Sequence, residues 1–358
     1  MSDKRYIDDL RSETAGATGV SVTKIETSIR FDNVGKQTGY LRVPYSSHAS
    51  AYGWIPLPLT VIRGAAPGPT VLLLGGVHGD EYEGQIALAK MVRAFESKDV
   101  AGTLIVLPST NLPAAVANNR LSPVDNVNLN RAFPGDANGT PTQMIAHYIE
   151  EVLLPTCDYV IDLHSGGSSL EYLPCVRARL SANLQIRHKT LEMVRAFDAE
   201  FGVLFRPAKA EPRTMSAACE RKGVVYINPE TGGGARVARK ALQAAHEGTL
   251  RCLLALEMIE DASARRSSGG TRTATLVAGA SLVHSDSDGV WEPLVELGEA
   301  VVPGQPLAAV YNLKKPWLAP QTVSGSIAGT VLCRRAAAWV EVGDCLFEIG
   351  VDFDPESA

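Results

Sequence analysis

The residues best suited to chemistry in this sequence are His78 and Glu81, which follow an apolar segment ending in Gly75 and Gly76. If the chain turned into a helix here, an imidazole and a carboxylate at this spacing would share one helical face. Zinc binds both groups, and a catalytic zinc site needs three protein ligands and one open position. The pair therefore predicts two of the three ligands of a metal site.

The third ligand is expected to be His164. It ends the segment 159–163, which is expected to be a β-strand, and small residues follow it. In open α/β sheets, ligands bind beyond the carboxyl ends of strands, and His78 also follows a predicted strand. Asp162 would lie on the same face of the strand as His164. There it could orient the imidazole, or it could be an ordinary buried hydrogen-bonding residue.

A hydrolytic zinc site also needs a general base. Glu230 is the candidate, because it follows the predicted strand 223–228 and stands just before three glycines, residues 232–234. Such glycines would permit a close backbone approach to a ligand. The alternative is that Glu230 only caps the helix predicted from residue 235.

A long segment between the predicted strand 102–107 and the predicted helix 141–153 carries Arg120, Asn130 and Arg131. Loops of this length are usually functional or disordered. An arginine beside an asparagine suits a carboxylate, and Arg120 could hold an oxyanion that develops on a carbonyl. For each arginine, the alternative is a solvated loop position.

The surrounding pattern predicts an α/β domain with a largely parallel sheet, because strand-like and helix-like segments alternate. The predicted strands are 18–30, 53–63, 70–75, 102–107, 159–163 and 223–228, and the predicted helices are 83–97, 141–153, 183–198 and 235–260. A linker is expected at 262–271. Beyond it helical periodicity ends, and the similar stretches 289–310 and 325–349 predict a small all-β unit with two halves. We therefore expect a catalytic α/β domain over 1–262, with an N-terminal extension and strands over 1–60, and a C-terminal β domain over 263–358.

Composition narrows the classes of function. The net charge of −5 argues against a nucleic-acid-binding protein. No apolar run approaches the roughly 20 residues that span a bilayer, and the polar start does not resemble a secretory signal. The six cysteines lie far apart, which is typical of reduced thiols and predicts a cytoplasmic protein without disulfides.

The four motifs occur in one order: HxxE after a strand, Asn-Arg in a loop, DxH at a strand end, and Glu-Thr-Gly-Gly at another strand end. In this the chain resembles the zinc carboxypeptidase superfamily and, within it, the succinylglutamate desuccinylase/aspartoacylase family, over roughly residues 55–350. The resemblance implies a mixed, largely parallel sheet with flanking helices and a barrel-sandwich-like C-terminal β domain. It also implies that His78, Glu81 and His164 hold one zinc ion per chain.

The same resemblance implies roles for the remaining candidates. Glu230 would take a proton from the attacking water and pass it to the leaving nitrogen. Asn130 and Arg131 would bind the substrate carboxylate, and Arg120 would stabilise the tetrahedral oxyanion. Residues that could read the substrate side chain are left unranked; they are Glu171, Tyr172, Arg177, Glu211 and Arg213.

The expected activity is hydrolysis of the amide of a small N-acyl amino acid. Overall similarity to ectoine-degradation enzymes, including residues 288–293, favours deacetylation of N-alpha-acetyl-L-2,4-diaminobutyrate. The alternatives are a deacylase of the succinylglutamate or N-acetylaspartate type, a zinc carboxypeptidase, and a non-catalytic binding module or carrier. The expected partner is a small molecule and neither nucleic acid nor a membrane; a homo-oligomer is compatible with the sequence.

Overall fold

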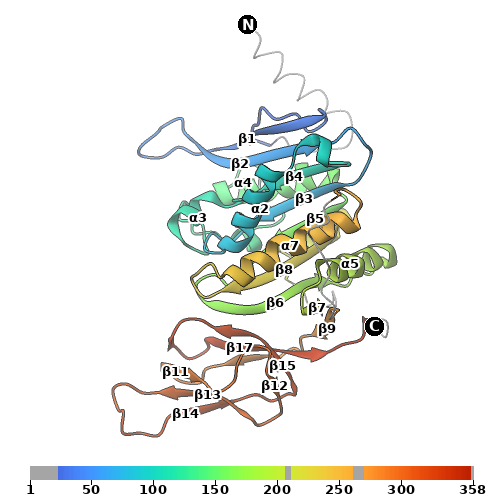
Figure 1. The fold of residues 1–358 in the computed structure, drawn as a ribbon. Helices are drawn as coiled ribbons and strands as arrows, with labels where there is room; N and C mark the ends of the chain where they lie inside the picture. The colour runs from blue at the N-terminus through green and yellow to red at the C-terminus, as the bar shows by residue number, and fades with distance from the viewer. Residues whose placement is uncertain (1–22, 206–210, 261–269, 356–358) are drawn as a thin grey trace.

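The computed structural model describes residues 23–205, 211–260 and 270–355. Helices lie on both faces of a long sheet, and C-terminal strands gather at one end of the molecule (Figure 1). The first eight strands are β1 (Gly35–Pro44), β2 (Trp54–Arg63), β3 (Thr70–Gly75), β4 (Thr103–Leu107), β5 (Tyr159–Leu163), β6 (Leu170–Arg179), β7 (Phe201–Phe205) and β8 (Val225–Gly233). The α-helices are α2 (Tyr82–Ala94), α3 (Leu112–Ala117), α4 (Pro141–Tyr148), α5 (Leu184–Phe197), α6 (Met215–Lys222) and α7 (Arg239–Ala255). Shorter turns are η1 (Ser97–Asp99), η2 (Leu129–Arg131), η3 (Ile149–Leu153) and η4 (Leu154–Thr156).

The sheet is mixed. Its order is β1-β2-β4-β3-β5-β8-β6-β7, and it continues through β9 into the C-terminal strands. The neighbours β4, β3, β5 and β8 are parallel, whereas β1, β2 and β6 join by antiparallel pairing. The expectation of a largely parallel sheet therefore holds for the centre of the sheet. The carboxyl ends of β3, β5 and β8 lie side by side, and these ends carry the candidate site.

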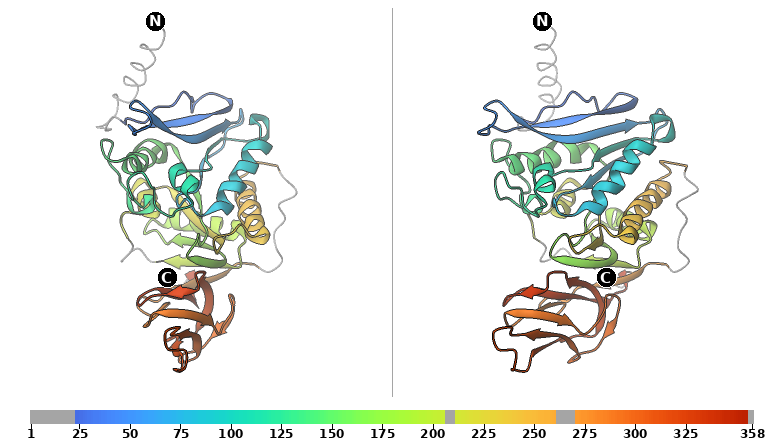
Figure 2. Two further views of the ribbon diagram at one scale, coloured as in Figure 1. Left: turned by 90° about the vertical axis from the view of Figure 1, so that its left-hand side faces the viewer. Right: turned by 60° about the vertical axis from the view of Figure 1, so that its left-hand side comes forward.

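The central strands are apolar because helices cover both of their faces. In β3, Val71 and Leu73 belong to one buried cluster with side chains of α2, α5 and α7. Leu72 and Leu74 point the other way and join a cluster with side chains of α4 and α6. Figure 2 shows the two helical layers from the side. A strand buried on both faces has no polar alternation, which explains the continuous apolar run in the sequence.

Several elements differ from the prediction. Of the predicted strand 18–30, residues 18–22 lie outside the described residues, and the rest forms only the bridge between Glu26 and Arg42. The long strand β1 was not predicted. Strand β6 was not predicted either, because Pro174 and three charged residues interrupt the strand pattern in its sequence. In the structure the register between β6 and β8 shifts between Tyr172 and Cys175, on either side of this proline. The predicted loop around Arg120 contains α3 and η2.

The C-terminal strands form two interlocked halves, in agreement with the sequence similarity of 289–310 and 325–349. Strand β11 pairs with β16 and β12 pairs with β15, so each half completes the other. A separate apolar cluster, which includes Trp291, Leu307 and Phe347, fills their interior. The strands are β9 (Arg272–Thr275), β10 (Leu282–His284), β11 (Gly289–Pro293), β12 (Ala300–Val301), β13 (Pro306–Tyr311), β14 (Gln321–Ser324), β15 (Gly329–Arg335), β16 (Trp339–Val340) and β17 (Cys345–Asp352).

The predicted domain boundary at 262/263 and most of the predicted linker 262–271 lie outside the described residues. The two-domain division stays a prediction, and the sheet crosses that point: β9 pairs with β7 on one side and with β17 on the other. In the part of the chain that the structure describes, no helix has the length and apolarity needed to cross a membrane.

Candidate metal centre

His78 and Glu81 lie in and just after a tight turn at the end of β3. Gly76 adopts a φ of +63° at its start, a conformation that glycine tolerates best. The N–H of Glu81 donates to the carbonyl of His78 at 3.3 Å. Helix α2 begins only at Tyr82, and Glu81 is its N-cap residue without a side-chain capping bond. The expectation that the two side chains share one face of a helix is therefore wrong. The turn before the helix brings them together, and the Glu81 carboxylate is available for contacts other than capping.

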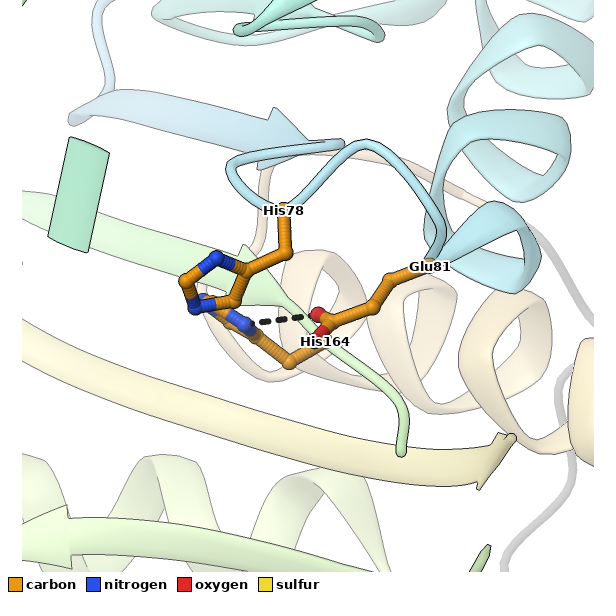
Figure 3. Close-up of side chains that lie close together, drawn as sticks. All are labelled: His78, Glu81 and His164. Carbon is orange, nitrogen blue, oxygen red and sulfur yellow. Dashed lines mark ion pairs between the residues drawn. The ribbon is translucent and has the colours of Figure 1, made fainter. Parts of the chain in front are cut away.

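His164 stands directly after β5, and backbone bonds fix it beside β8. Its N–H donates to the carbonyl of Pro229 at 2.9 Å, and its own carbonyl accepts from the N–H of Thr231 at 3.0 Å. The side chain turns toward the β3–α2 turn, where Nδ1 lies 2.8 Å from Oε2 of Glu81. Figure 3 shows this contact, with the His78 ring beside that of His164. Two strand ends that are distant in sequence therefore meet at one point.

The three side chains form a compact, buried donor set. One ligand atom from each lies within 4.8 Å of the others, and the exposed fractions of His78, Glu81 and His164 are 2%, 2% and 3%. Within the described residues, Nδ1 of His78 has no hydrogen-bond partner although it is buried. A buried imidazole with an unpaired nitrogen, close to a carboxylate and a second imidazole, fits a metal ligand, and two imidazoles with one carboxylate are a donor set that zinc accepts.

The electrostatics of the two histidines differ. Burial is the largest cause that lowers the pKa of His78 well below its ordinary value, and the nearby charges of Arg120 and His164 add to it. A neutral imidazole is the form that binds metal. Burial also disfavours the charged form of His164, but the carboxylates of Asp162 and Glu81 outweigh it and raise its pKa well above the ordinary value. The carboxylates thus favour positive charge at this point.

Asp162 approaches the other side of the His164 ring. Its Oδ2 lies 3.0 Å from Nε2 of His164 and accepts a hydrogen bond from the Tyr226 hydroxyl at 3.0 Å. The side chain is completely buried. This distance places Asp162 where a carboxylate that orients the imidazole would lie, and its bond with Tyr226 is that of a buried hydrogen-bonding residue.

Glu230 lies within β8, in bridge pairing with His164. Helix α7 begins at Arg239, so Glu230 does not cap a helix at 235 as the alternative required. Its Oε2 is buried without a hydrogen-bond partner among the described residues. Burial is the main cause that raises its pKa; the carboxylate of Glu81 acts in the same direction, while the charges of His164, Arg177 and Arg120 oppose it. A carboxyl with a raised pKa can both take and release a proton near neutral pH.

The glycines after Glu230 allow one close backbone contact within the protein. Gly232, Gly233 and Gly234 all adopt positive φ. A Cβ on Gly233 would stand 2.3 Å from the carbonyl oxygen of Leu170 and 2.6 Å from Cα of Gly166. At Gly233 the close approach is therefore to the loop after His164, and it locks that loop against the end of β8. A close approach of these glycines to a ligand stays a prediction.

Arg120, Asn130 and Arg131 line one cavity of about 530 Å³ together with the donor set and Glu230. Nη1 of Arg120 lies 3.2 Å from Oε1 of Glu81. Oδ1 of Asn130 accepts from the N–H of Met215 at 2.9 Å, so the amide NH₂ is the part left to donate. Arg131 is exposed at the cavity wall, and burial followed by the charge of Arg120 lowers its pKa. The structure thus brings together His78, Glu81, Arg120, Asn130, Arg131, His164 and Glu230.

Other lining residues were not ranked or not found from the sequence. Tyr172, Arg177 and Glu211 line the cavity, whereas Glu171 and Arg213, from the same unranked set, do not. Arg179 and Asn228 also line it, and no sequence motif marks them. Glu348 of β17 contacts Arg177. It lies 171 residues away in the sequence, so only the pairing of β17, β15 and β6 reveals the contact.

The chain matches one family model, described as the succinylglutamate desuccinylase/aspartoacylase catalytic domain, over residues 67–256. It is 34% identical over 322 residues to the N-alpha-acetyl-L-2,4-diaminobutyric acid deacetylase of Halomonas elongata, covering 90% of this chain and 93% of that protein.

Solved structures give the same result. A succinylglutamate desuccinylase/aspartoacylase from Rhodobacter sphaeroides superposes with a TM-score of 0.88 at 34% identity, over 93% of this chain and all of that one. The product-bound ectoine utilization protein EutE of Ruegeria pomeroyi also gives 0.88, at 33% identity over 92% of this chain and 99% of that one. This chain belongs to the succinylglutamate desuccinylase/aspartoacylase family.

Proposed function

We propose that the protein is a zinc-dependent deacylase of small N-acyl amino acids and that its substrate is N-alpha-acetyl-L-2,4-diaminobutyrate. The observation that carries the proposal is the meeting of a buried His-Glu-His donor set with a buried glutamate in one cavity. The 34% identity with a deacetylase of that substrate supports the narrower part. The products would be acetate and a free amine. The proposal retains the cytoplasmic location expected from the six cysteines, none of which is paired.

His78, Glu81 and His164 would hold the metal, since their donor atoms are close together and buried. A zinc ion bound there would polarise the acyl carbonyl and lower the pKa of water. Asp162 would keep the His164 ring in place from its far side. The metal requirement and the identity of the metal belong to this proposal.

Glu230 would act as the base and then the acid. Its raised pKa suits a group that accepts a proton from water as the carbonyl is attacked and delivers it to the amide nitrogen as the C–N bond breaks. Arg120 would donate to the oxyanion, because its guanidinium lies beside Glu81 at the same wall.

Asn130 and Arg131 would hold the substrate carboxylate. The side-chain oxygen Oδ1 of Asn130 accepts a hydrogen bond from the N–H of Met215, so the side-chain NH₂ group would point at the ligand. Arg131 donates from Nη1 to the backbone carbonyl of Asn130 at 2.7 Å, and both residues line the cavity. An amide and a guanidinium in this arrangement offer several N–H donors to one carboxylate.

A substrate panel tests the proposal. Zinc-loaded protein is given N-acetyl-diaminobutyrate, N-acetylaspartate, N-succinylglutamate, N-formyl amino acids and a dipeptide, and the free amine is measured. We expect the highest kcat/KM with N-acetyl-diaminobutyrate. A preference for N-acetylaspartate or N-succinylglutamate would refute the narrow assignment, a preference for the dipeptide would favour a peptidase, and inactivity on every compound would reject the deacylase proposal.

A further inference from the structure

Arg177 occupies the cavity wall next to the proposed base. In the antiparallel pairing of β6 and β8, Cys175 lies opposite Glu230 and Arg177 lies opposite Asn228. Residues opposite each other, and residues two apart on one strand, have side chains on the same face. Arg177 and Glu230 therefore project from the same face of the sheet, and both line the cavity.

The charge of Arg177 is matched by a residue from the C-terminal strands. Nη1 of Arg177 donates to both carboxylate oxygens of Glu348, at 2.7 and 3.0 Å. Glu348 pairs with Cys333 in β15, and Cys333 pairs with Tyr172 in β6. The carboxylate is thus delivered to the cavity wall by a continuous stretch of sheet.

The ion pair between Arg177 and Glu348 is largely buried, so its net charge affects ligand binding in the cavity. The side chains of Arg177 and Glu348 are 19% and 6% exposed, and the guanidinium lies 4.8 Å from the ring centre of Phe205. Charges in such surroundings are weakly screened. Within the described part of the chain, Nε and Nη2 of Arg177 donate no hydrogen bond. These two nitrogens can donate hydrogen bonds to a ligand, while Glu348 keeps the net charge of the ion pair at zero.

We propose that Glu348 is a positioning residue that fixes Arg177 and cancels its charge beside the reacting bond, so that the site selects substrates whose side chain is neutral or cationic. The inference rests on the proposed function and narrows its substrate class to N-acyl amino acids with one carboxylate. A second substrate carboxylate, as in N-acetylaspartate, would be attracted only weakly by Arg177, because Glu348 already neutralises the charge of the guanidinium. For the same reason, Arg177 would not repel an amine in the substrate side chain. Arg179 also lines the cavity. It lies two residues beyond Arg177 on β6, past the residues that pair with β8, and is therefore further from Glu230 than Arg177 is.

The test is the ratio of kcat/KM for N-acetyl-diaminobutyrate to that for N-acetylaspartate in Glu348→Gln. The amide keeps the size of the side chain and exposes the charge of Arg177. We expect the ratio to fall by at least about tenfold, because a unit charge uncovered near a ligand in a poorly screened site changes binding by that factor or more. A folded variant with a ratio within twofold of wild type overturns the inference.

Two further variants separate charge from packing. Arg177→Gln/Glu348→Gln removes both charges, so the ratio should return to within about threefold of wild type even if both rates fall. If the double variant shows the same altered ratio as Glu348→Gln, packing and not charge is responsible, and the inference fails. Glu171→Gln is the matched control: Glu171 joins β6 to the neighbouring strand β15 through Arg334 but does not line the cavity, and the ratio in this variant should stay unchanged.

Product binding to the wild-type protein provides a second measurement if Glu348→Gln does not fold. We expect 2,4-diaminobutyrate to inhibit at a concentration at least about tenfold lower than aspartate. Stronger inhibition by aspartate overturns the inference. A wild-type enzyme without activity on any N-acyl amino acid is a failure of the proposed function instead, and the substrate panel detects it independently.

Discussion

The carboxylate of Asp162 lies 3.0 Å from Nε2 of His164. Glu81 lies 2.8 Å from the other ring nitrogen, so the imidazole is held between two carboxylates. Only one of these belongs to the donor set. The other comes from the interior of β5 and is anchored by the hydroxyl of Tyr226, so it can fix the ring without occupying a metal coordination position.

Asp162→Asn should therefore weaken metal binding by about 10- to 100-fold, the usual effect of losing a carboxylate that orients a ligating histidine. Competition with a chromophoric chelator measures the affinity. Tyr226→Phe is the control, because it removes the hydroxyl and keeps the carboxylate, and its affinity should stay within a few-fold of wild type. Unchanged affinity in Asp162→Asn would show that the contact does not support the metal site.

Removal of the metal should abolish turnover and lower thermal stability. The donor set places two histidines and a carboxylate in the interior, and an ion that binds only the folded state stabilises it. Dialysis against a chelator, followed by metal analysis and thermal unfolding, tests both effects, with zinc added back as the control. We expect one ion per chain to restore activity and melting temperature together. Full activity in metal-free protein would exclude the proposed mechanism.

Glu230→Gln should lower kcat by about 10²- to 10⁴-fold, the range that general acid–base groups contribute. The amide has nearly the same shape but cannot take the proton from water. Because Glu230 is outside the donor set, the variant should keep one metal ion per chain, and metal analysis provides that control. Near-wild-type turnover in the metal-loaded variant would remove Glu230 from the mechanism.

Arg131→Ala and Arg120→Ala should affect different kinetic constants. Loss of Arg131 removes a charged partner of the substrate carboxylate, so KM should rise by about 10- to 100-fold with a smaller change in kcat. Loss of Arg120 removes an oxyanion donor, so kcat should fall by about 10²- to 10³-fold. Steady-state kinetics on the preferred substrate distinguishes them, and the opposite pattern would require the two roles to be exchanged.

The sequence alone was sufficient to predict that the members of the donor set lie close together. Each of them comes after an apolar strand, and the ends of parallel strands share one edge of a sheet. His164 and Glu230 were predicted on that basis, and the structure places them in bridge pairing. The resemblance to the family that the comparisons confirm added their expected order and roles.

The parts that were not predicted depend on contacts that no local pattern records. Strand β6 contains a proline and charged residues, and two of the charged residues, Arg177 and Arg179, line the cavity. One of its two arginines, Arg177, is paired by Glu348 from the far end of the chain. The glycines after Glu230 were predicted to allow a close approach, and at Gly233 the structure shows such an approach by the loop at Gly166. Sequence spacing gives the distance along the chain and not the identity of the neighbour.

Gly79, between the two ligands of the first motif, should not tolerate a side chain. A Cβ there would stand 2.0 Å from the carbonyl carbon of Ala114 in the backbone of α3, so the turn carrying His78 and Glu81 or the helix would have to move. We expect Gly79→Ala to destabilise the fold by about 1–3 kcal/mol and to weaken metal binding, measured by thermal unfolding and chelator competition. Gly39→Ala is the control, since its Cβ would make only ordinary side-chain contacts, with Ile29 at 3.4 Å and with Oγ of Ser28 at 3.9 Å. Wild-type stability and metal affinity in Gly79→Ala would show that α3 can shift without disturbing the turn.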